Sequence, residues 1–167
     1  MASESTSGVG TYSFGQPPSN LFDGNLNTRF SSRGSAGNND LAGLNTGFYM
    51  TIAQCQPVLT GFRFGNVYNA SDREPILITI EGTNCADVET CTNWTLLYNN
   101  GSTGLDVAKD SLDYGEYRSI TNNAIYQSYR FLVTAKRDIS AFVSYSEVEL
   151  FGSSSQTSTT TTSSKFS

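Results

Sequence analysis

The strongest constraint on the fold is a series of short apolar segments, each about the length of a β-strand, separated by Gly, Asn, Asp and Pro. Between residues 10 and 152, no apolar pattern is sustained at the 3.6-residue period of a helix. The clearest segments are rich in β-branched and aromatic residues and lie at residues 48–53, 58–64, 76–80, 94–98, 129–134 and 143–151. This pattern predicts an all-β fold with little helix.

Alternation within these segments indicates half-buried strands. In the last segment, Val148 and Leu150 alternate with Glu147 and Glu149, so the two types face opposite sides of a strand. Such alternation is typical of antiparallel sheets with one solvated face. Because the connecting loops are uneven in length, the segments predict two packed antiparallel sheets, a β-sandwich, rather than a regular meander.

Composition excludes several classes of function. The 167 residues carry 10 Lys and Arg against 15 Asp and Glu, a net charge of -5, which argues against binding to nucleic acid or to anionic lipid. The chain has no histidine, so Ser-His-Asp catalysis and zinc sites that use imidazole are excluded. No pair of carboxylates is distinguished by a motif, and we expect the protein not to be an enzyme.

The polar composition is typical of an extracellular β protein. Charged residues make up 15% of the chain, below the usual ~25%, and Ser, Thr, Asn and Gly supply most of the polarity. No segment approaches the roughly 20 apolar residues that cross a bilayer. We therefore expect a secreted protein or the ectodomain of a cell-surface protein.

The chain divides into one domain and two flanking segments. Residues 1–9 are expected to be disordered or loosely attached, and residues 10–152 to form the β-sandwich. Twelve of the last fifteen residues, 153–167, are Ser or Thr, which predicts a linker or stalk, either plain and flexible or O-glycosylated. Further domains are expected beyond it.

The three cysteines predict one disulfide. Cys85 and Cys91 are separated by five residues between two strand segments, so a small loop can close through a bond between them. Cys55 is then left over beside an apolar strand. It is interpreted as a buried small hydrophobic residue, with an intermolecular bridge as the alternative.

Three stretches of the chain together resemble a known family. Residues 20–30 (NLFDGNLNTRF) contain an Asp-Gly turn followed by Thr, one residue and an aromatic residue. The second stretch, residues 57–84 and the following NWTLLY, contains a core strand, an Arg-Glu-Pro sequence and a W-x-x-L run. The third stretch, residues 129–152, ends in SEVELFG. In this order they resemble the coagulation factor 5/8 type C, or discoidin, domain and the family 32 carbohydrate-binding modules of the galactose-binding-like superfamily.

This resemblance implies an eight-stranded, jelly-roll-like antiparallel β-sandwich with ligand loops at one end. The chain departs from the family pattern at three points. Phe30 replaces a Trp, Glu74 stands where Asp is usual, and the paired terminal cysteines of animal discoidin domains are absent.

A calcium site is the second implication of the resemblance. The Asp-Gly turn concentrates oxygen donors that suit Ca²⁺, and its spacing does not match an EF-hand. In family 32 modules a structural calcium in this turn is completed by an acidic residue of the last strand. By motif position the similarity nominates Asp23, Asn25, Thr28 and Glu147 as metal ligands. The alternative is a solvated Asx turn without an ion.

Candidate ligand contacts lie in three loops. A saccharide site needs an aromatic face for the C–H surface of the sugar ring and planar polar groups for its hydroxyls. The residues that meet this description are Arg33, Asn39, Asn66, Tyr68, Asn69, Asp72, Arg73, Arg137 and Phe142. In family 32 modules an aromatic residue before the closing strand stacks on the sugar, and Phe142 occupies that place. The usual histidine contact has no counterpart, which puts galactose specificity in doubt.

The sequence thus predicts a non-catalytic, lectin-like module that binds glycans or glycoconjugates and is stabilised by calcium. The alternative is an adhesion module that binds a protein or matrix partner through the same loops, because function resides in the loops and not in the sandwich. For each candidate contact, a purely structural role such as an ion pair within a loop or core packing remains open.

Overall fold

The computed structural model describes residues 12–34, 40–53, 57–107 and 112–153. The expected N-terminal segment, nearly all of the Ser/Thr tail, and Cys55 lie outside these ranges. The described residues form two short 3₁₀ helices, η1 (Pro18–Leu21) and η2 (Ser71–Arg73), and nine strands. The strands are β1 (Phe30–Ser32), β2 (Gly47–Thr51), β3 (Val58–Phe64), β4 (Pro75–Thr83), β5 (Thr95–Ser102), β6 (Arg118–Ser119), β7 (Ser128–Lys136), β8 (Val143–Tyr145) and β9 (Val148–Ser153).

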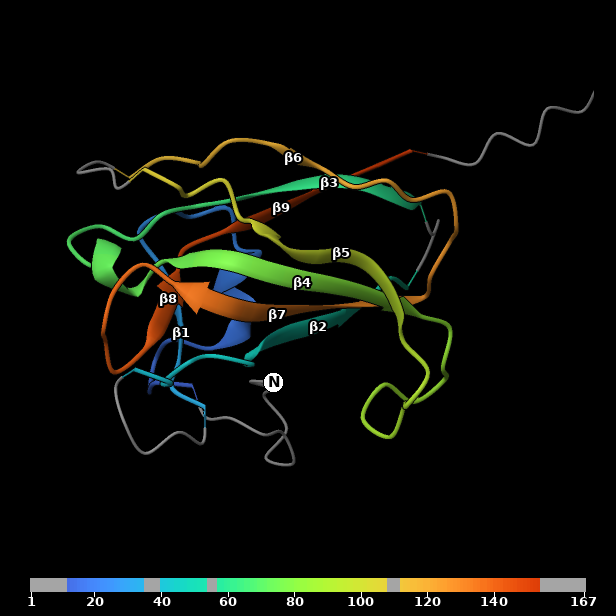
Figure 1. Cartoon of the computed structure of the whole chain (residues 1–167), viewed down its shortest axis with the longest axis horizontal. Helices are drawn as coiled ribbons and strands as arrows, with labels where there is room; N and C mark the ends of the chain where they lie inside the picture. Colours follow the sequence, from blue (N-terminus) through green and yellow to red (C-terminus); the bar gives the residue numbers. More distant parts are fainter. Residues whose placement is uncertain (1–11, 35–39, 54–56, 108–111, 154–167) are drawn as a thin grey trace, which may run out of the picture.

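The strands assemble into three antiparallel sheets, as Figure 1 shows. The largest has the order β2-β7-β4-β5 and faces a three-stranded sheet of order β6-β3-β9. A two-stranded sheet, β1-β8, lies at one end and pairs Phe30 with Tyr145. All strand pairs are antiparallel. The expected all-β sandwich of antiparallel sheets is confirmed.

The last apolar segment forms two strands instead of one. The break falls at Ser146 and Glu147, whose backbone groups bond to Gly65. The Ser146 N–H donates to the Gly65 carbonyl at 3.1 Å, and the Gly65 N–H donates to the Glu147 carbonyl at 2.8 Å. Glu147 is consequently buried, with 3% exposure, although strict alternation placed it on a solvated face. This break is one reason why the described residues contain nine strands where eight were expected.

Two strands were not predicted because their sequences carry no strand pattern. β1 is only three residues long and has two serines, and β6 is an isolated Arg-Ser pair. Both are held in place by their neighbours, β8 and β3 respectively, and not by local preference.

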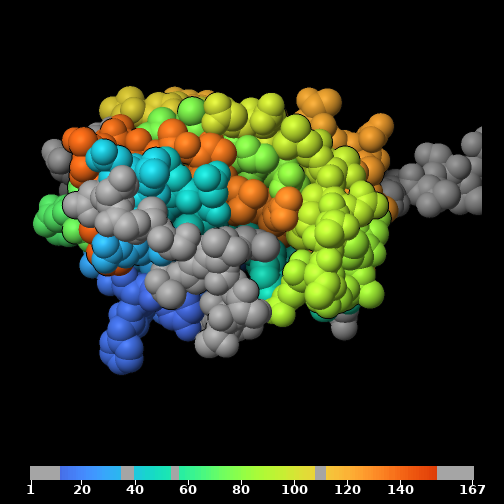
Figure 2. All heavy atoms as spheres, turned by 60° about the horizontal axis from the view of Figure 1, so that its bottom comes forward, coloured from blue at the N-terminus to red at the C-terminus, as the bar shows by residue number. Residues whose placement is uncertain are grey.

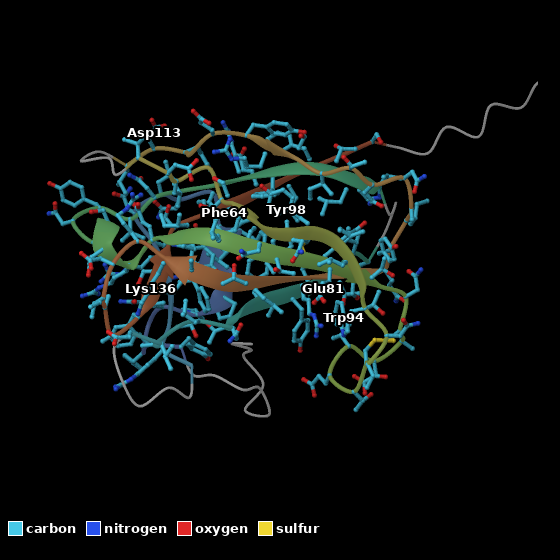
Figure 3. The ribbon with its side chains drawn as sticks, in the orientation of Figure 1. Phe64, Glu81, Trp94, Tyr98, Asp113 and Lys136 are labelled. Atoms are coloured by element: carbon cyan, nitrogen blue, oxygen red, sulfur yellow. A yellow bond between two sulfur atoms is a disulfide. The ribbon has the colours of Figure 1, made fainter. Side chains whose placement is uncertain are left out.

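An unbroken series of aromatic contacts joins the three sheets through the core. Phe48 of β2 stacks on Phe131 of β7 at a centroid distance of 4.7 Å, and Phe131 meets Phe62 of β3 edge to face at 6.5 Å. Phe64, next along this face of β3, contacts Tyr145 of β8 at 5.1 Å. Figure 3 shows Phe64 between the two larger sheets. The two sheets are therefore packed through aromatic rings, which bury large areas per residue.

A small loop closed by a disulfide lies at one end of the sandwich. At one end, Cys85 and Cys91 form the disulfide expected from their spacing, with Cα atoms 5.9 Å apart, and close a small loop after β4. Trp94 is packed beside this loop, where its indole N–H donates to the Cys91 carbonyl at 3.0 Å and Arg130 lies over its ring.

Neither helix in the described ranges has the length and apolar character to cross a membrane.

The aromatic core predicts a large difference between two substitutions in the main sheet. Phe131→Ala should lower the free energy of unfolding by about 3–5 kcal/mol, because Phe131 is 1% exposed and its removal opens a cavity between the sheets. Leu96→Ala on β5, where the side chain is 51% exposed, should change it by less than about 0.5 kcal/mol. Urea denaturation of both variants measures this difference, and equal losses would contradict the assigned core.

Candidate functional site

Four connections between strands gather at the end of the sandwich opposite the disulfide loop. Their described parts are residues 33–34 and 40–46 between β1 and β2, 65–74 between β3 and β4, 103–107 and 112–117 between β5 and β6, and 137–142 between β7 and β8. Figure 2 shows the residues after β7, in orange, beside those before β2, in cyan. We call this set of connections the loop end.

Arg137 ties three of these connections together. Its Nε donates to the Ser71 carbonyl at 3.1 Å, and its Nη1 donates to the Asp106 carbonyl at 3.1 Å. Its Nη2 donates to Glu74 Oε2 at 2.8 Å and also to the Leu105 carbonyl. Arg137 was predicted to contact ligand, but all three of its side-chain nitrogens are occupied by the protein. Four of its five N–H donors are thus used within the protein, so Arg137 acts as a structural clamp.

The carboxylate that holds this clamp is buried. Glu74 is 0% exposed, and its second oxygen accepts the Val67 N–H at 3.4 Å. Burial raises the pKa of Glu74, and the Arg137 guanidinium opposes that shift. Because a buried carboxylate is costly without a partner, Glu74 and Arg137 each depend on the other to remain in the interior.

Lys136 provides a second link, which sequence reasoning missed. Its Nζ donates to the Ala42 carbonyl at 2.8 Å and to the Ser140 carbonyl at 2.5 Å, so it joins the connection before β2 to the one after β7. Burial lowers the pKa of Lys136. Figure 3 shows this residue at the loop end of β7. A lysine at the end of a strand carries no sequence signal for such a role, because its partners are backbone carbonyls distant in the chain.

Arg73 and Phe142 come together at the loop end from two different connections. The Arg73 guanidinium lies over the Phe142 ring at 5.8 Å, and Nε is 3.8 Å from Asp72 Oδ2. Both the Arg73 side chain, which is 36% exposed, and Phe142 are partly accessible. The Asp138 N–H donates to the Asp72 carbonyl at 3.0 Å, which holds the same two connections together. An aromatic ring, a planar cation and a carboxylate therefore lie side by side at the loop end.

The remaining candidates fall into different environments. Tyr68 is 56% exposed at the tip of residues 65–74, with Asn69 beside it in the left-handed region at φ 53°. Arg33 is exposed after β1. Asn66 was predicted to contact ligand but is 1% exposed, and its Oδ1 accepts the Asp113 N–H at 2.8 Å. Asn39 lies outside the described residues.

A shallow hollow of about 350 Å³ opens beside Lys136. Asp40 and Leu44 line one side, and residues 134–139 line the other. Ile139 at its edge is 68% exposed. The hollow has mixed polar and apolar walls, and its volume is within the range of small-molecule sites.

The Asp-Gly turn meets the last strand, as the resemblance implied. The backbone N–H of Asn25 donates both to Asp23 Oδ1 at 2.8 Å and to Glu147 Oε1 at 2.9 Å. Thr28 Oγ1 donates to Asp23 Oδ2 at 2.8 Å. Two carboxylates from positions 124 residues apart therefore converge on one amide. The Asn25 side chain instead accepts bonds from Asn27.

The electrostatics of this turn suit a cation. Burial and the neighbouring Asp23 raise the pKa of Glu147, whereas the bonds from Thr28 and Glu147 lower the pKa of Asp23. Within the described ranges, no ion pair includes either carboxylate. No cluster of three acidic or cysteine side chains forms among the described residues, so a cation would be held by two carboxylates together with hydroxyl or backbone oxygens. Hard oxygens of this kind fit Ca²⁺.

The sequence matches no family model. Nor is any curated protein similar enough in sequence to be counted as a relative. Similarity is found among solved structures, where the fold is compared directly.

The structural matches are to small β-sandwich modules. A family 32 module of a family 31 glycoside hydrolase from Clostridium perfringens aligns with a TM-score of 0.60 at 17% identity, over 81% of each chain. The family 32 module of C. perfringens NanJ, solved in complex with galactose, aligns at 0.58 and 13% identity, over 83% of this chain and 87% of that one. An F5/8 type C domain from Bacteroides fragilis aligns at 0.57 and 16% identity, over 83% and 82%.

These alignments span most of the sandwich in each protein. The chain therefore has the discoidin-like fold of family 32 carbohydrate-binding modules and F5/8 type C domains.

Proposed function

We propose that this chain is a non-catalytic, extracellular module that binds glycans through the loop end. The observation that carries the proposal is the pairing of Arg73 with Phe142, which supplies an aromatic face and a planar hydrogen-bond donor at one exposed place. The galactose complex of a module with the same fold supports a saccharide as the ligand class. The proposed contacts of this site are Arg33, Asn69, Asp72, Arg73 and Phe142, whereas the exposed Tyr68 lines a separate hollow.

The loop end is suited to binding because it is held in one arrangement before ligand arrives. The Arg137 and Lys136 links join connections that are distant in sequence, so less loop entropy is lost when a sugar binds. An extracellular setting is supported by the disulfide between Cys85 and Cys91, since such bonds persist in oxidising compartments.

A structural calcium ion at the Asp-Gly turn is the second part of the proposal. Asp23, Thr28 and Glu147 would hold it, and Asn25 positions the two carboxylates through its N–H. The ion would offset the repulsion between the carboxylates and join residues 22–29 to the start of β9. Its role is to stabilise the fold next to the loop end, not to take part in a reaction.

Binding of glycans predicts a specific loss in two variants. On a glycan array, Phe142→Ala and Arg73→Ala should each weaken the signal for the preferred sugar at least about tenfold, because each removes one half of the stacking and hydrogen-bonding pair. Phe151→Ala, a 37% exposed phenylalanine on β9 outside the loop end, is the matched control and should retain binding. A silent array together with capture of a defined matrix protein would instead support the adhesion alternative.

The buried ion pair predicts a loss of both stability and affinity. Glu74→Gln should lower the free energy of unfolding by about 3 kcal/mol, because Arg137 loses its carboxylate in the interior. The affinity for sugar should fall together with the stability, because the three connections that Arg137 joins become less fixed. Glu149→Gln is the control, because it breaks an ion pair at the surface: the side chains of Glu149 and Arg63 are 36% and 37% exposed. It should lower the free energy of unfolding by less than about 1 kcal/mol. Urea denaturation and titration calorimetry distinguish the two, and equal effects would contradict the clamp.

Calcium binding predicts a change in melting temperature. At about 100 times its dissociation constant, calcium should stabilise the protein by about 2.7 kcal/mol relative to EDTA, a shift of roughly 5–10 °C. Glu147→Gln should abolish this shift, and Glu149→Gln, two residues further along, should keep it. Equal melting temperatures in calcium and in EDTA would assign the turn to the ion-free Asx alternative.

A further inference from the structure

A second hollow lies between the Asp-Gly turn and residues 65–74. Its volume is about 450 Å³, within the range of small-molecule sites. Tyr68 lines it but does not line the hollow beside Lys136. The two hollows share no lining residue, so the region around the loop end offers two separate places for a ligand.

The apolar part of this hollow suits a sugar ring. Leu26, Val67 and Leu112 line it together with the exposed Tyr68. Val67 is 3% exposed and its backbone N–H bonds to the buried Glu74, so this part of the wall is rigid. A rigid apolar wall beside an exposed tyrosine matches the C–H surface of a pyranose.

The polar part of the hollow carries a positive charge and no negative one. Arg29 lines it, with amide groups from Gln16, Asn20 and Asn27. No Asp or Glu is among the described residues that line it, although the chain has more acidic than basic residues. In the described part of the molecule, no ion pair includes Arg29. The guanidinium is thus left to face a ligand.

The backbone at Arg29 is held in place. Asn20 Nδ2 donates to the Arg29 carbonyl at 2.8 Å, which joins η1 to the residue before β1. The neighbouring Thr28 is anchored to Asp23 and to the Asn25 carbonyl, each at 2.8 Å. A guanidinium mounted on a fixed backbone can form the paired hydrogen bonds that a carboxylate accepts.

We propose that this hollow is a second saccharide site that selects an acidic sugar, with Arg29 binding the carboxylate of a uronate unit and Tyr68 packing against its ring. The amides of Gln16, Asn20 and Asn27 are placed to bind its hydroxyls. The site rests on the proposed function only for the class of ligand, a saccharide, because it uses neither Arg73 nor Phe142.

Titration calorimetry with digalacturonic acid and with the neutral disaccharide of galactose tests the proposal. The full chain should bind the acidic disaccharide at least about tenfold more tightly, and 0.5 M salt should reduce this preference. Arg29→Gln should remove the preference, whereas Arg29→Lys should keep part of it through its charge. If Arg29→Gln does not fold, Tyr68→Ala at the 56% exposed tip is the substitute and should weaken acidic binding to a similar extent.

The same titrations on Phe142→Ala separate the two sites. Retained binding of the acidic disaccharide in this variant, with its loss in Arg29→Gln, supports the second site whether or not neutral sugars bind at Arg73 and Phe142. Equal affinity for the two disaccharides overturns the proposal. Loss of acidic binding in Phe142→Ala with retention in Arg29→Gln also overturns it, and leaves the loop end as the binding site.

Discussion

The structure depends on the aromatic rings that connect its sheets. Phe131 lies between Phe48 and Phe62, and so joins the edge of the main sheet to the centre of the opposite one. From Phe64 the contacts continue to Tyr145 in the small β1-β8 sheet. Because these rings fill the space between the sheets, the strands that bear them hold fixed positions. Three of the four connections at the loop end begin or end on those strands.

At the loop end, charged side chains serve two different purposes. Arg137 and Lys136 turn inward and use their donors on backbone carbonyls and on Glu74, so they hold connections together. Arg73 and Arg29 remain partly accessible and, with the exposed Arg33, are the cations that we propose for ligand contact.

Much of the architecture was predictable from local pattern. Strands β2, β3, β4, β5 and β7 have apolar residues at strand spacing, and the Asp-Gly turn and SEVELFG ending identified the fold. β1 and β6 escaped prediction because they are short and polar and are held by pairing partners. The burial of Glu147 was also missed, because the strand breaks where Gly65 bonds to its backbone. Alternation assumes an unbroken strand.

The sequence by itself determined the class of fold, the pairing of Cys85 with Cys91 and the meeting of Asp23 with Glu147, because short-range pattern and a family motif carry that information. Only the tertiary structure decided which candidate side chains are free for ligand. Asn66 and Arg137 have the same chemistry as the residues that we propose for ligand contact. Their partners, Asp113 and Glu74, are 47 and 63 residues away. Such partners become neighbours only when the sheets pack, so no local pattern distinguishes a clamp from a contact.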